Sequence, residues 1–531
     1  MDNFNYHLCI IMTQSSDSII QKKTCPISGK DFSITQWDLD FYDKISPTFA
    51  GQKFQIPIPT LCPEERQRRR LAFRNERHLY RRTCDASGKQ IISMYRPDNG
   101  YKVYDQKVWY SDSRNALDYG QEYDFSKTFT ENFLSLSLQV PRPSMYNYFA
   151  ENSDYCNCTN YQKDCYLTSA SGRNERCMYS AYTNDSISCI DSFMTFNCEN
   201  SYMTIDCEKS YKLIYANNCK NCSESYFLTN CNNCNNCFDC DELENASYCF
   251  QNQQLSKEDY LKRLEWILLT DYINSWKCKK QKNTILYSEW CIWSHIRNSK
   301  NSTFCFDVNN IEECKYCTRF LDSKSCYDIY SRGQNSELCY ESVAIWENNY
   351  NNLFCANVDT NSRDILYSMH CRSCQDCFGC CWLSEQQYCI FNKQYTKEEY
   401  ENQVAKIITH MQSTGEWWEF FHPSLSPFGY NETVAQEYYP LQNGDNLLKR
   451  YKWSDYESPK PVSDKVIQWK DLPESIDEVH DDILHYAIAC EVTGKLFRIQ
   501  PQELVFYRKN HIPLPRKHPE QRHLERLALR K

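Results

Sequence analysis

The chain has 531 residues, of which 41% are hydrophobic and 15% aromatic, enough for several folded cores and too many for a wholly disordered chain. Only 12 residues are glycine, and neither GxGxxG nor GxxxxGK[ST] occurs, which argues against a glycine-looped nucleotide-binding α/β fold. The net charge of −9 argues against polyanion binding by bulk charge and leaves that role to local basic patches.

Residues 1–24 lack the features of a targeting or membrane segment. They have no basic start and one short apolar run at 9–12, and no 18-residue apolar stretch follows. We expect an N-terminal tail, no membrane contact and a cytoplasmic protein. In a reducing compartment the 33 cysteines would be metal ligands or small buried hydrophobes rather than disulfides.

The two ends of the chain are copies of one module. CPISGKDFSITQWDLDFYDK (25–44) matches CEVTGKLFRIQPQELVFYRK (490–509), and PIPTLCPEERQRRRLAFR (57–74) matches PLPRKHPEQRHLERLALR (513–530). We therefore predict related α+β modules over 25–111 and 481–531. A linker with one helix is expected over 112–150.

Both modules carry regularly spaced arginines in a predicted helix. In the first copy these arginines share an arc of about 80° at 3.6 residues per turn. Arginine suits phosphate, so the stripe predicts contact with nucleic acid; the alternative, which we weigh more heavily, is intramolecular pairing with acidic solenoid surfaces. The candidate nucleic-acid-binding residues are Arg66, Arg70, Arg74, Arg77, Arg81, Arg522, Arg526 and Arg530.

The middle of the chain is a tandem duplication. Seven cysteines recur at one offset of 140 residues: Cys165, Cys177, Cys231, Cys234, Cys237, Cys240 and Cys249 match Cys305, Cys317, Cys371, Cys374, Cys377, Cys380 and Cys389. The match runs on to Tyr260 and Tyr400, so each module should end in a helix capped by Ser256 or Thr396. We place the modules at 151–280 and 281–412 and an aromatic connector at 413–480.

Within each module the cysteines recur at intervals of about nine or twelve residues. Such short rungs, rich in Asn, Ser, Thr and Tyr, are typical of β-solenoids, for which we expect coils of about twenty residues with two cysteine rungs each. The predicted fold is mainly β with short helices: two cysteine-rich solenoid modules flanked by the α+β end modules.

Each module contains one C-x2-C-x2-C-x2-C run: Cys231, Cys234, Cys237 and Cys240, and Cys371, Cys374, Cys377 and Cys380. Three interpretations are open. The run differs from the ferredoxin spacing, which weakens an iron–sulfur cluster. Zinc binding is chemically reasonable. Reduced thiols stacked as solenoid rungs would also explain the cysteines that have no paired ligand, and we favour this interpretation.

The end modules resemble the zinc-ribbon segment C-x2-C-G-K-x-F…FY…P…C-P-x-C-R of small bacterial domains. The whole layout resembles large cysteine-rich proteins of candidate-phyla (Patescibacteria-type) bacteria. This resemblance implies a zinc-ribbon-like fold at both ends and no established activity. The motif positions carried over are Cys25, Cys62, Cys490 and His518 as ligands, with Ser28, Glu65, Thr493 and Gln521 where their partners should stand. With half the ligands replaced, we favour packing over zinc at both ends.

No Cys, His and carboxylate grouping indicates a nucleophile with its base, so an enzyme has no positive support. We expect a non-enzymatic scaffold or binding protein with a macromolecular partner, RNA or a ribonucleoprotein, reached through the arginine-rich helices. The alternative is a metal-binding or redox protein that uses the C-x2-C runs, with zinc as the cofactor.

Overall fold

The structure is a computed structural model that describes residues 18–530, except 112–113, 266, 268, 270–271, 274–284, 287, 289–291, 320, 329–336, 338, 346, 418, 446–449, 458, 460–462 and 464. Residues 1–17 of the predicted tail, and the predicted boundary between the two repeats, lie outside the described residues. In the part of the chain that is described, no helix has the length and apolar character needed to cross a membrane.

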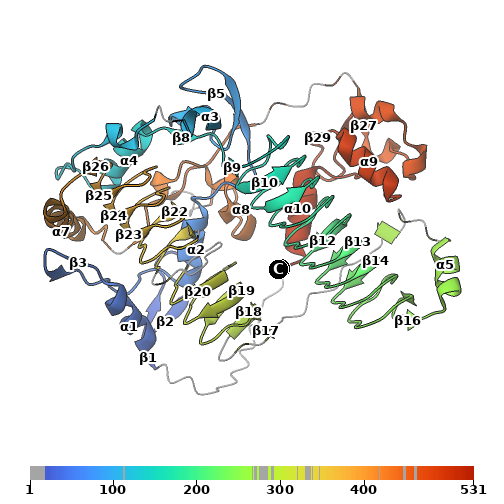
Figure 1. The fold of residues 1–531 in the computed structure, drawn as a ribbon, viewed down its shortest axis with the longest axis horizontal. Coiled ribbons are helices and arrows are strands. Elements are labelled where there is room, and N and C mark those ends of the chain that lie inside the picture. Colours follow the sequence, from blue (N-terminus) through green and yellow to red (C-terminus); the bar gives the residue numbers. More distant parts are fainter. Residues whose placement is uncertain are drawn as a thin grey trace.

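The molecule is mainly β, with a few short helices and a β-solenoid of about 17 turns in two stacks (Figure 1). Solenoid 1 (147–254) contains β9 (Asn147–Tyr148), β10 (Thr159–Lys163), β11 (Gly172–Glu175), β12 (Tyr202–Ile205), β13 (Tyr211–Asn217), β14 (Ser223–Thr229), β15 (Cys249–Phe250) and β16 (Gln253–Gln254). Solenoid 2 (285–394) contains β17 (Ile285–Leu286), β18 (Ile292–Arg297), β19 (Thr303–Glu312), β20 (Leu321–Lys324), β21 (Val343–Ile345), β22 (Ala356–Val358), β23 (Arg363–Leu366), β24 (Gln375–Phe378), β25 (Gln387–Ile390) and β26 (Lys393–Gln394).

One coil of solenoid 1 takes 12 residues. Residue 169 pairs in parallel with 181, and 181 with 193, and this step continues through the stack. In solenoid 2 some steps are 13 residues, as between Glu337 and Tyr350. The expected coil of about twenty residues is therefore wrong, because the cysteines mark only some of the interior positions.

Each coil is built from four three-residue sides. The first residue of each triplet points inward, the second pairs with the neighbouring coil, and the third has a positive φ, such as 53° at Asn233. This left-handed conformation is costly for side chains branched at Cβ and is best tolerated by Asn, Asp and Gly. Accordingly, none of the positive-φ residues in the described ranges is Val, Ile or Thr. The triplet explains why the interior cysteines of solenoid 1, such as Cys177, Cys189 and Cys198, are spaced by multiples of three.

Small polar side chains fill the interior because the coil turns its own backbone groups inward. The N–H of Cys222 donates to Ser210 Oγ of the preceding coil at 3.2 Å, and Cys177 N–H donates to Cys165 Sγ at 3.4 Å. A larger apolar residue would leave these buried N–H groups without an acceptor.

Each solenoid ends in a short antiparallel hairpin and a helix. The hairpins are β15–β16 and β25–β26, and the helices are α5 (Lys257–Glu265) and α7 (Lys397–Thr414). Thr396 caps α7 in a capping box with Glu399, and Ser256 Oγ accepts from Asp259 N–H at 3.1 Å. The predicted helices and both of their capping residues are confirmed.

Both end modules have two strands followed by two helices, and the N-terminal copy has an extra hairpin between its helices. The N-terminal module (19–74) contains β1 (Ile19–Thr24), β2 (Asp31–Thr35), α1 (Gln36–Ile45), β3 (Thr48–Phe49), β4 (Gln52–Lys53) and α2 (Pro63–Leu71). The C-terminal module (487–530) contains β28 (Ala487–Ala489), β29 (Leu496–Phe497), α9 (Pro501–Lys509) and α10 (Pro519–Ala528), with β27 (Val466–Gln468) added to its sheet. The zinc-ribbon character of these modules stays a prediction.

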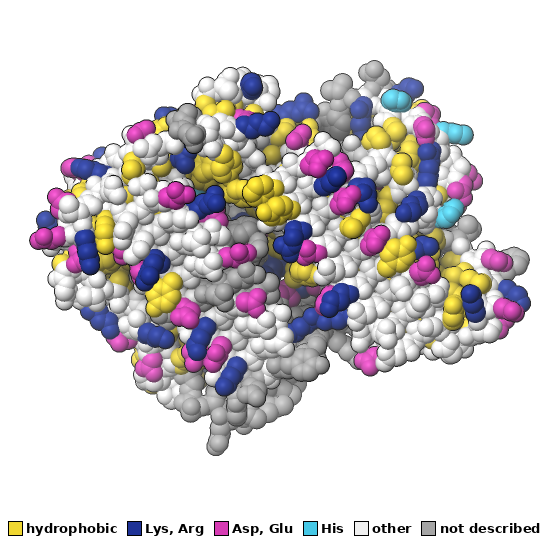
Figure 2. Space-filling view, in the orientation of Figure 1, with side chains coloured by type: hydrophobic (Ala, Val, Ile, Leu, Met, Phe, Trp, Pro, Cys, Tyr) yellow, Lys and Arg dark blue, Asp and Glu magenta, His cyan; other side chains and the backbone are white. Residues whose placement is uncertain are grey.

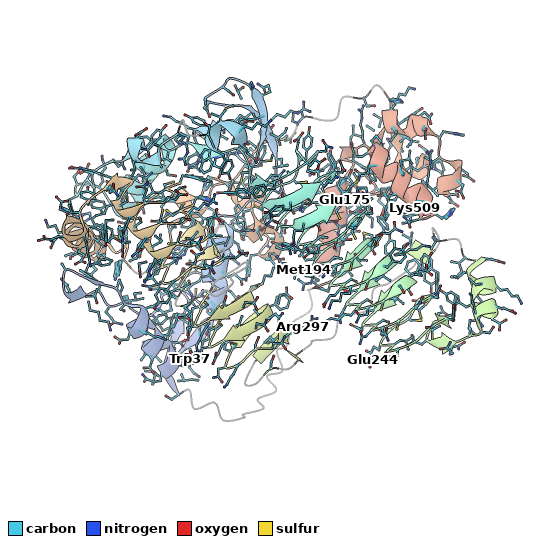
Figure 3. All side chains as sticks on the ribbon, viewed as in Figure 1. Trp37, Glu175, Met194, Glu244, Arg297 and Lys509 are labelled. Carbon is cyan, nitrogen blue, oxygen red and sulfur yellow. The ribbon has the colours of Figure 1, made fainter. Side chains whose placement is uncertain are left out.

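The two modules dock in a crossed arrangement. The N-terminal module packs on solenoid 2: Phe41 stacks on Tyr327 at 3.8 Å, and Trp37 lies 4.3 Å from the Lys315 ammonium group. Figure 3 shows Trp37 beside the strands of solenoid 2. The C-terminal module packs on solenoid 1, where Tyr507 meets Tyr202 at 5.6 Å. Each module therefore docks on the solenoid farther from it in the sequence.

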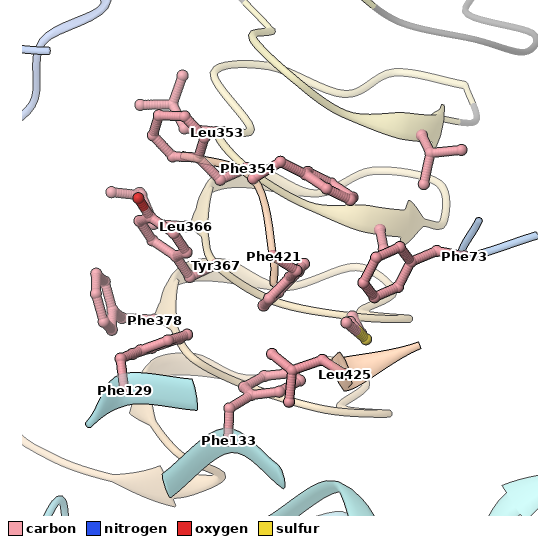
Figure 4. Close-up of a cluster of buried hydrophobic side chains, with 14 of the residues drawn as sticks. Phe73, Phe129, Phe133, Leu353, Phe354, Leu366, Tyr367, Phe378, Phe421 and Leu425 are labelled. Atoms are coloured by element: carbon pink, nitrogen blue, oxygen red, sulfur yellow. The ribbon is translucent and has the colours of Figure 1, made fainter. Parts of the chain in front are cut away.

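Most of the remaining segments cover solenoid 2. They comprise β5 (Tyr80–Thr83), β6 (Gln90–Ser93), β7 (Val103–Tyr104), α3 (Gln106–Trp109), η1 (Ala116–Tyr119), α4 (Phe129–Gln139), β8 (Arg142–Pro143), η2 (Pro423–Leu425), η3 (Tyr430–Glu432) and α8 (Val434–Tyr438). The turns η5 (Trp469–Asp471), η6 (Ile476–Glu478) and η7 (Asp481–His485) instead pack with the C-terminal module on solenoid 1. Phe129 and Phe133 of α4 and Phe421 of the predicted connector pack on Tyr367 and Phe378 of solenoid 2 (Figure 4). This aromatic core holds α3 and α4 beside the solenoid.

Candidate functional site

The four cysteines of each C-x2-C-x2-C-x2-C run occupy the four interior positions of one coil. Their three-residue spacing equals one side of the coil, so all four thiols point into the same interior. All eight are at most 2% exposed: Cys231, Cys234, Cys237, Cys240, Cys371, Cys374, Cys377 and Cys380. The structure therefore brings together the members of each predicted set.

These thiols act as hydrogen-bond donors to the backbone. Cys231 Sγ donates to Thr229 O at 3.2 Å, as Ser180 Oγ does to Met178 O at 2.8 Å. Within the runs, hydrogen bonds between neighbouring thiols raise the pKa of Cys371 and lower the pKa of Cys374 to about 4. Outside the runs, burial raises the pKa of Cys156 and Cys198 to about 12. Among the described residues, no group of three or more His, Cys, Asp or Glu could hold a metal ion. Metal binding by the runs stays a prediction.

Each end module brings two predicted ligands near each other. Cys25 and Cys62 are buried in one small cluster, where Ser28 Oγ lies 3.5 Å from Cys62 Sγ. In the other module Cys490 is buried. Burial raises the pKa of the Cys490 thiol, but hydrogen bonds with the His518 backbone and with Thr493 outweigh burial and lower this pKa. His518 itself caps α10, accepting from Glu520 N–H at 3.1 Å, and burial lowers its pKa to about 4.

The other two motif positions of each module, Ser28 and Glu65 at one end and Thr493 and Gln521 at the other, do not add Cys or His side chains. Glu65, the acidic substitute in the N-terminal module, forms an ion pair with Arg68 at 3.0 Å. Two ligand-type side chains per module fall short of the four that a structural zinc needs. Zinc at these positions stays a prediction.

The arginines of α2 are buried against solenoid 2. Arg66 Nε lies 2.6 Å from Asp328 Oδ2, and Arg70 Nη2 lies 3.4 Å from Asp328 Oδ1. The Arg66 guanidinium also lies 5.5 Å from the centre of the Tyr316 ring. Both arginines are only 1% exposed. They therefore show the intramolecular pairing with acidic solenoid residues that was the alternative to nucleic-acid contact.

The arginines of α10 repeat this arrangement on solenoid 1. Arg526 Nη1 lies 2.8 Å from Asp191 Oδ1, and Arg522 forms an ion pair with the same carboxylate and lies 4.9 Å from the Tyr179 ring. Arg530 pairs with Asp206 of solenoid 1 at 2.6 Å. It also pairs with Asp307 of solenoid 2 at 2.7 Å, so this residue joins the two stacks.

The other predicted nucleic-acid-binding arginines do not lie on a helix. Helix α2 ends at Leu71, and Arg81 lies in strand β5, so the expectation of one continuous helical stripe is wrong. Asn75 Oδ1 accepts from the N–H groups of Arg77 and His78, which turns the chain after the helix. Arg74 pairs with Glu76 and Arg77 with Glu437. Nucleic-acid binding by these residues stays a prediction.

A cleft of about 1080 Å³ lies between the first coils of solenoid 1 and one face of solenoid 2. Helix α3 and the segment after it form a third wall, with Trp109 and Tyr110. In Figure 2 hydrophobic side chains gather in the centre of the view, over β9, β10 and the neighbouring edge of solenoid 2. It is larger than the cavity of about 490 Å³ beside α10, and we take it as the candidate binding site.

Stacked aromatic rings form the solenoid 2 wall of the cleft. His370 and Trp382, one coil apart, stack at 3.9 Å and 7°, and Tyr146 stacks on Trp382 at 5.7 Å. Burial holds the pKa of His370 well below its usual range, so its ring is neutral. Trp382 is 2% exposed, and its Nε1–H lacks a hydrogen-bond partner within the described structure.

The solenoid 1 wall carries an open aromatic pair. Phe149 and Tyr161 occupy positive-φ positions one coil apart and stack at 4.8 Å and 14°. They are 73% and 54% exposed, which is unusual for such large apolar faces. Arg173 continues the same column on the next coil and pairs with Asp185 at 2.7 Å.

The cleft is more basic than the rest of the chain. Five basic and three acidic side chains line it, although the whole protein carries a net charge of −9. Lys107 and Arg372 are exposed there, and Arg114 lies 4.3 Å from the Trp109 ring. Of the predicted nucleic-acid-binding residues only Arg74 lines the cleft.

No protein-family model matches the chain, and no curated protein is similar to it. The predicted resemblance to Patescibacteria-type proteins therefore stays a prediction. The cleft residues were not predicted from the sequence, because they come from distant segments of the chain, from Phe73 to Glu385. A signal does exist: aromatic residues one coil apart at positive-φ positions form the stacked pairs of both walls.

Proposed function

We propose that the protein is a non-enzymatic binding protein that holds a macromolecular partner, RNA or a ribonucleoprotein, in the cleft between its solenoids. The observation that carries this proposal is the cleft itself, a cavity of about 1080 Å³ with open aromatic faces and a local excess of basic side chains. Such groups on a rigid scaffold are preorganised for binding. The arginine-rich helices then act as clamps that hold the end modules in place.

Hydrogen exchange on the full chain tests the location of the site. Fragmented total RNA should protect peptides that cover Tyr146–Tyr161 and Asn357–Glu385, because these segments form the two walls. Protection confined to α2 and α10 would instead indicate that RNA contacts the arginine-rich helices, and would contradict binding in the cleft. Protection nowhere, with RNA, protein extract or polysaccharide as probes, would contradict a binding role for the cleft.

A second candidate function is binding of a thiophilic metal ion by the cysteine runs. It is favoured by one observation, that all four interior positions of a single coil are cysteines in each solenoid. Anaerobic purification followed by elemental analysis tests it. One equivalent of zinc, iron or copper per run would support this function, and none would remove it. The thiol-to-carbonyl hydrogen bonds favour the metal-free alternative.

A further inference from the structure

We propose that the cleft recognises unpaired bases of single-stranded nucleic acid, with Phe149 and Tyr161 as the stacking platform and Lys107 and Arg372 as phosphate contacts. This inference rests on the proposed binding role of the cleft and names the chemistry of its occupant. It is argued from three features of the walls: the open ring faces, the stacked aromatic wall opposite them and the distribution of charge.

The first feature is the open face of the aromatic column. Rungs of a solenoid repeat at the spacing of adjacent strands, about 4.8 Å, so rings one coil apart lie parallel. Phe149 stands at the edge of the stack and is 73% exposed, with its ring parallel to that of Tyr161. A base can extend this column by stacking, as bases do on the aromatic residues of single-strand-binding proteins.

The second feature is the opposite wall. Trp382 stacks on His370 at 3.9 Å and on Tyr146 at 5.7 Å, and its carbonyl oxygen accepts from Arg114 at 3.3 Å. This wall is therefore a preorganised aromatic surface across the cleft from Phe149 and Tyr161.

The third feature is charge. Lys107 and Arg372 are exposed on the cleft rim, and the cleft carries more basic than acidic side chains in a chain of net charge −9. A polyanion is therefore attracted to this place and repelled by much of the remaining surface. A duplex would bury its base faces against one another, so the aromatic platform would have nothing to stack on. A neutral polysaccharide would make no use of the basic rim.

Fluorescence anisotropy with the full chain tests the inference. The probe is a labelled oligouridylate of about ten nucleotides, a length typical of single-strand sites, beside a duplex of equal length. We expect the single strand to bind more tightly. The double substitution Phe149→Ala, Tyr161→Ala should weaken binding roughly 5- to 100-fold. The substitution Arg372→Ala should reduce the slope of log affinity against log salt by about 0.7, the value for one phosphate contact.

Phe304→Ala is the matched control. Phe304 also has a positive φ, stacks on the residue one coil later at 5.3 Å and is 46% exposed, but it lies outside the cleft. It should leave affinity unchanged. Equal binding of duplex and single strand, or an unaffected double variant, would overturn the inference. If the oligonucleotide fails to bind while a neutral polysaccharide protects the cleft walls from hydrogen exchange, the nucleic-acid inference falls and the binding role of the cleft remains.

Discussion

The buried ion pairs of Asp191 make the clearest prediction about stability. This carboxylate is fully buried and serves two guanidiniums, those of Arg522 and Arg526, which are 4% and 0% exposed. Asp191→Asn keeps the shape and tolerates the positive φ of 53°, but it removes the charge that both arginines face. Removing one partner of a buried pair costs about 3–5 kcal/mol, so we expect a loss in that range.

Asp185→Asn is the matched control, because Asp185 also has a positive φ in solenoid 1 and pairs with an arginine, Arg173, at the surface. An exposed pair contributes about 1 kcal/mol or less. The measurements are urea unfolding and hydrogen exchange of α10, which should lose protection first. Arg526→Met should cost less in the Asp191→Asn background than alone. If the two Asp→Asn variants lost equal stability, the clamp interpretation would be refuted.

Three further predictions follow from the coil geometry. Asn233→Val should destabilise by about 1–2 kcal/mol, because the φ of 53° disfavours branched side chains, whereas Asn233→Gly should cost less than half of that in the same urea titration. Ser210→Ala should cost about 1–3 kcal/mol by orphaning Cys222 N–H, and Ser210→Cys should restore most of it; equal losses would contradict the interior hydrogen bond. Since burial raises the pKa of Cys156 and Cys198 to about 12 from an ordinary value of 9.0, their stabilisation is present below pH 9 and lost between pH 9 and 12. Unfolding followed at increasing pH should show a fall of roughly 1.4 kcal/mol per pH unit for each such thiol, and a flat profile to pH 11 would argue against protonated core thiols.

The repeated unit was predictable, and its coil length was not. The 140-residue offset and the caps at Ser256 and Thr396 are local signals, and the structure has both helices where those signals place them. The predicted coil length rested on the spacing of cysteines alone, although Ser, Thr and Asn occupy equivalent interior positions. Counting all small polar residues together would have shown the period of three.

The cleft and the docking of the end modules could not be predicted, because both depend on which distant surfaces meet. The arginine spacing in α2 and α10 is nearly the same, and each helix finds a tyrosine and an aspartate in the same column, Tyr316 with Asp328 and Tyr179 with Asp191. Because the two arginine helices and the two tyrosine–aspartate pairs are equivalent, the sequence does not show which helix docks on which solenoid. Nor does it show that the guanidiniums are buried.

The crossed docking sets an order of events during synthesis. The N-terminal module emerges from the ribosome first, yet its acidic partner in solenoid 2 lies 272 positions later, as between Arg69 and Glu341. At 5–20 residues per second the module waits roughly 15 to 50 s before its docking surface exists. The C-terminal module is made after both solenoids and meets a solenoid 1 that is already complete. The N-terminal module is therefore held only after solenoid 2 has formed, and it can dock before the C-terminal module has been made.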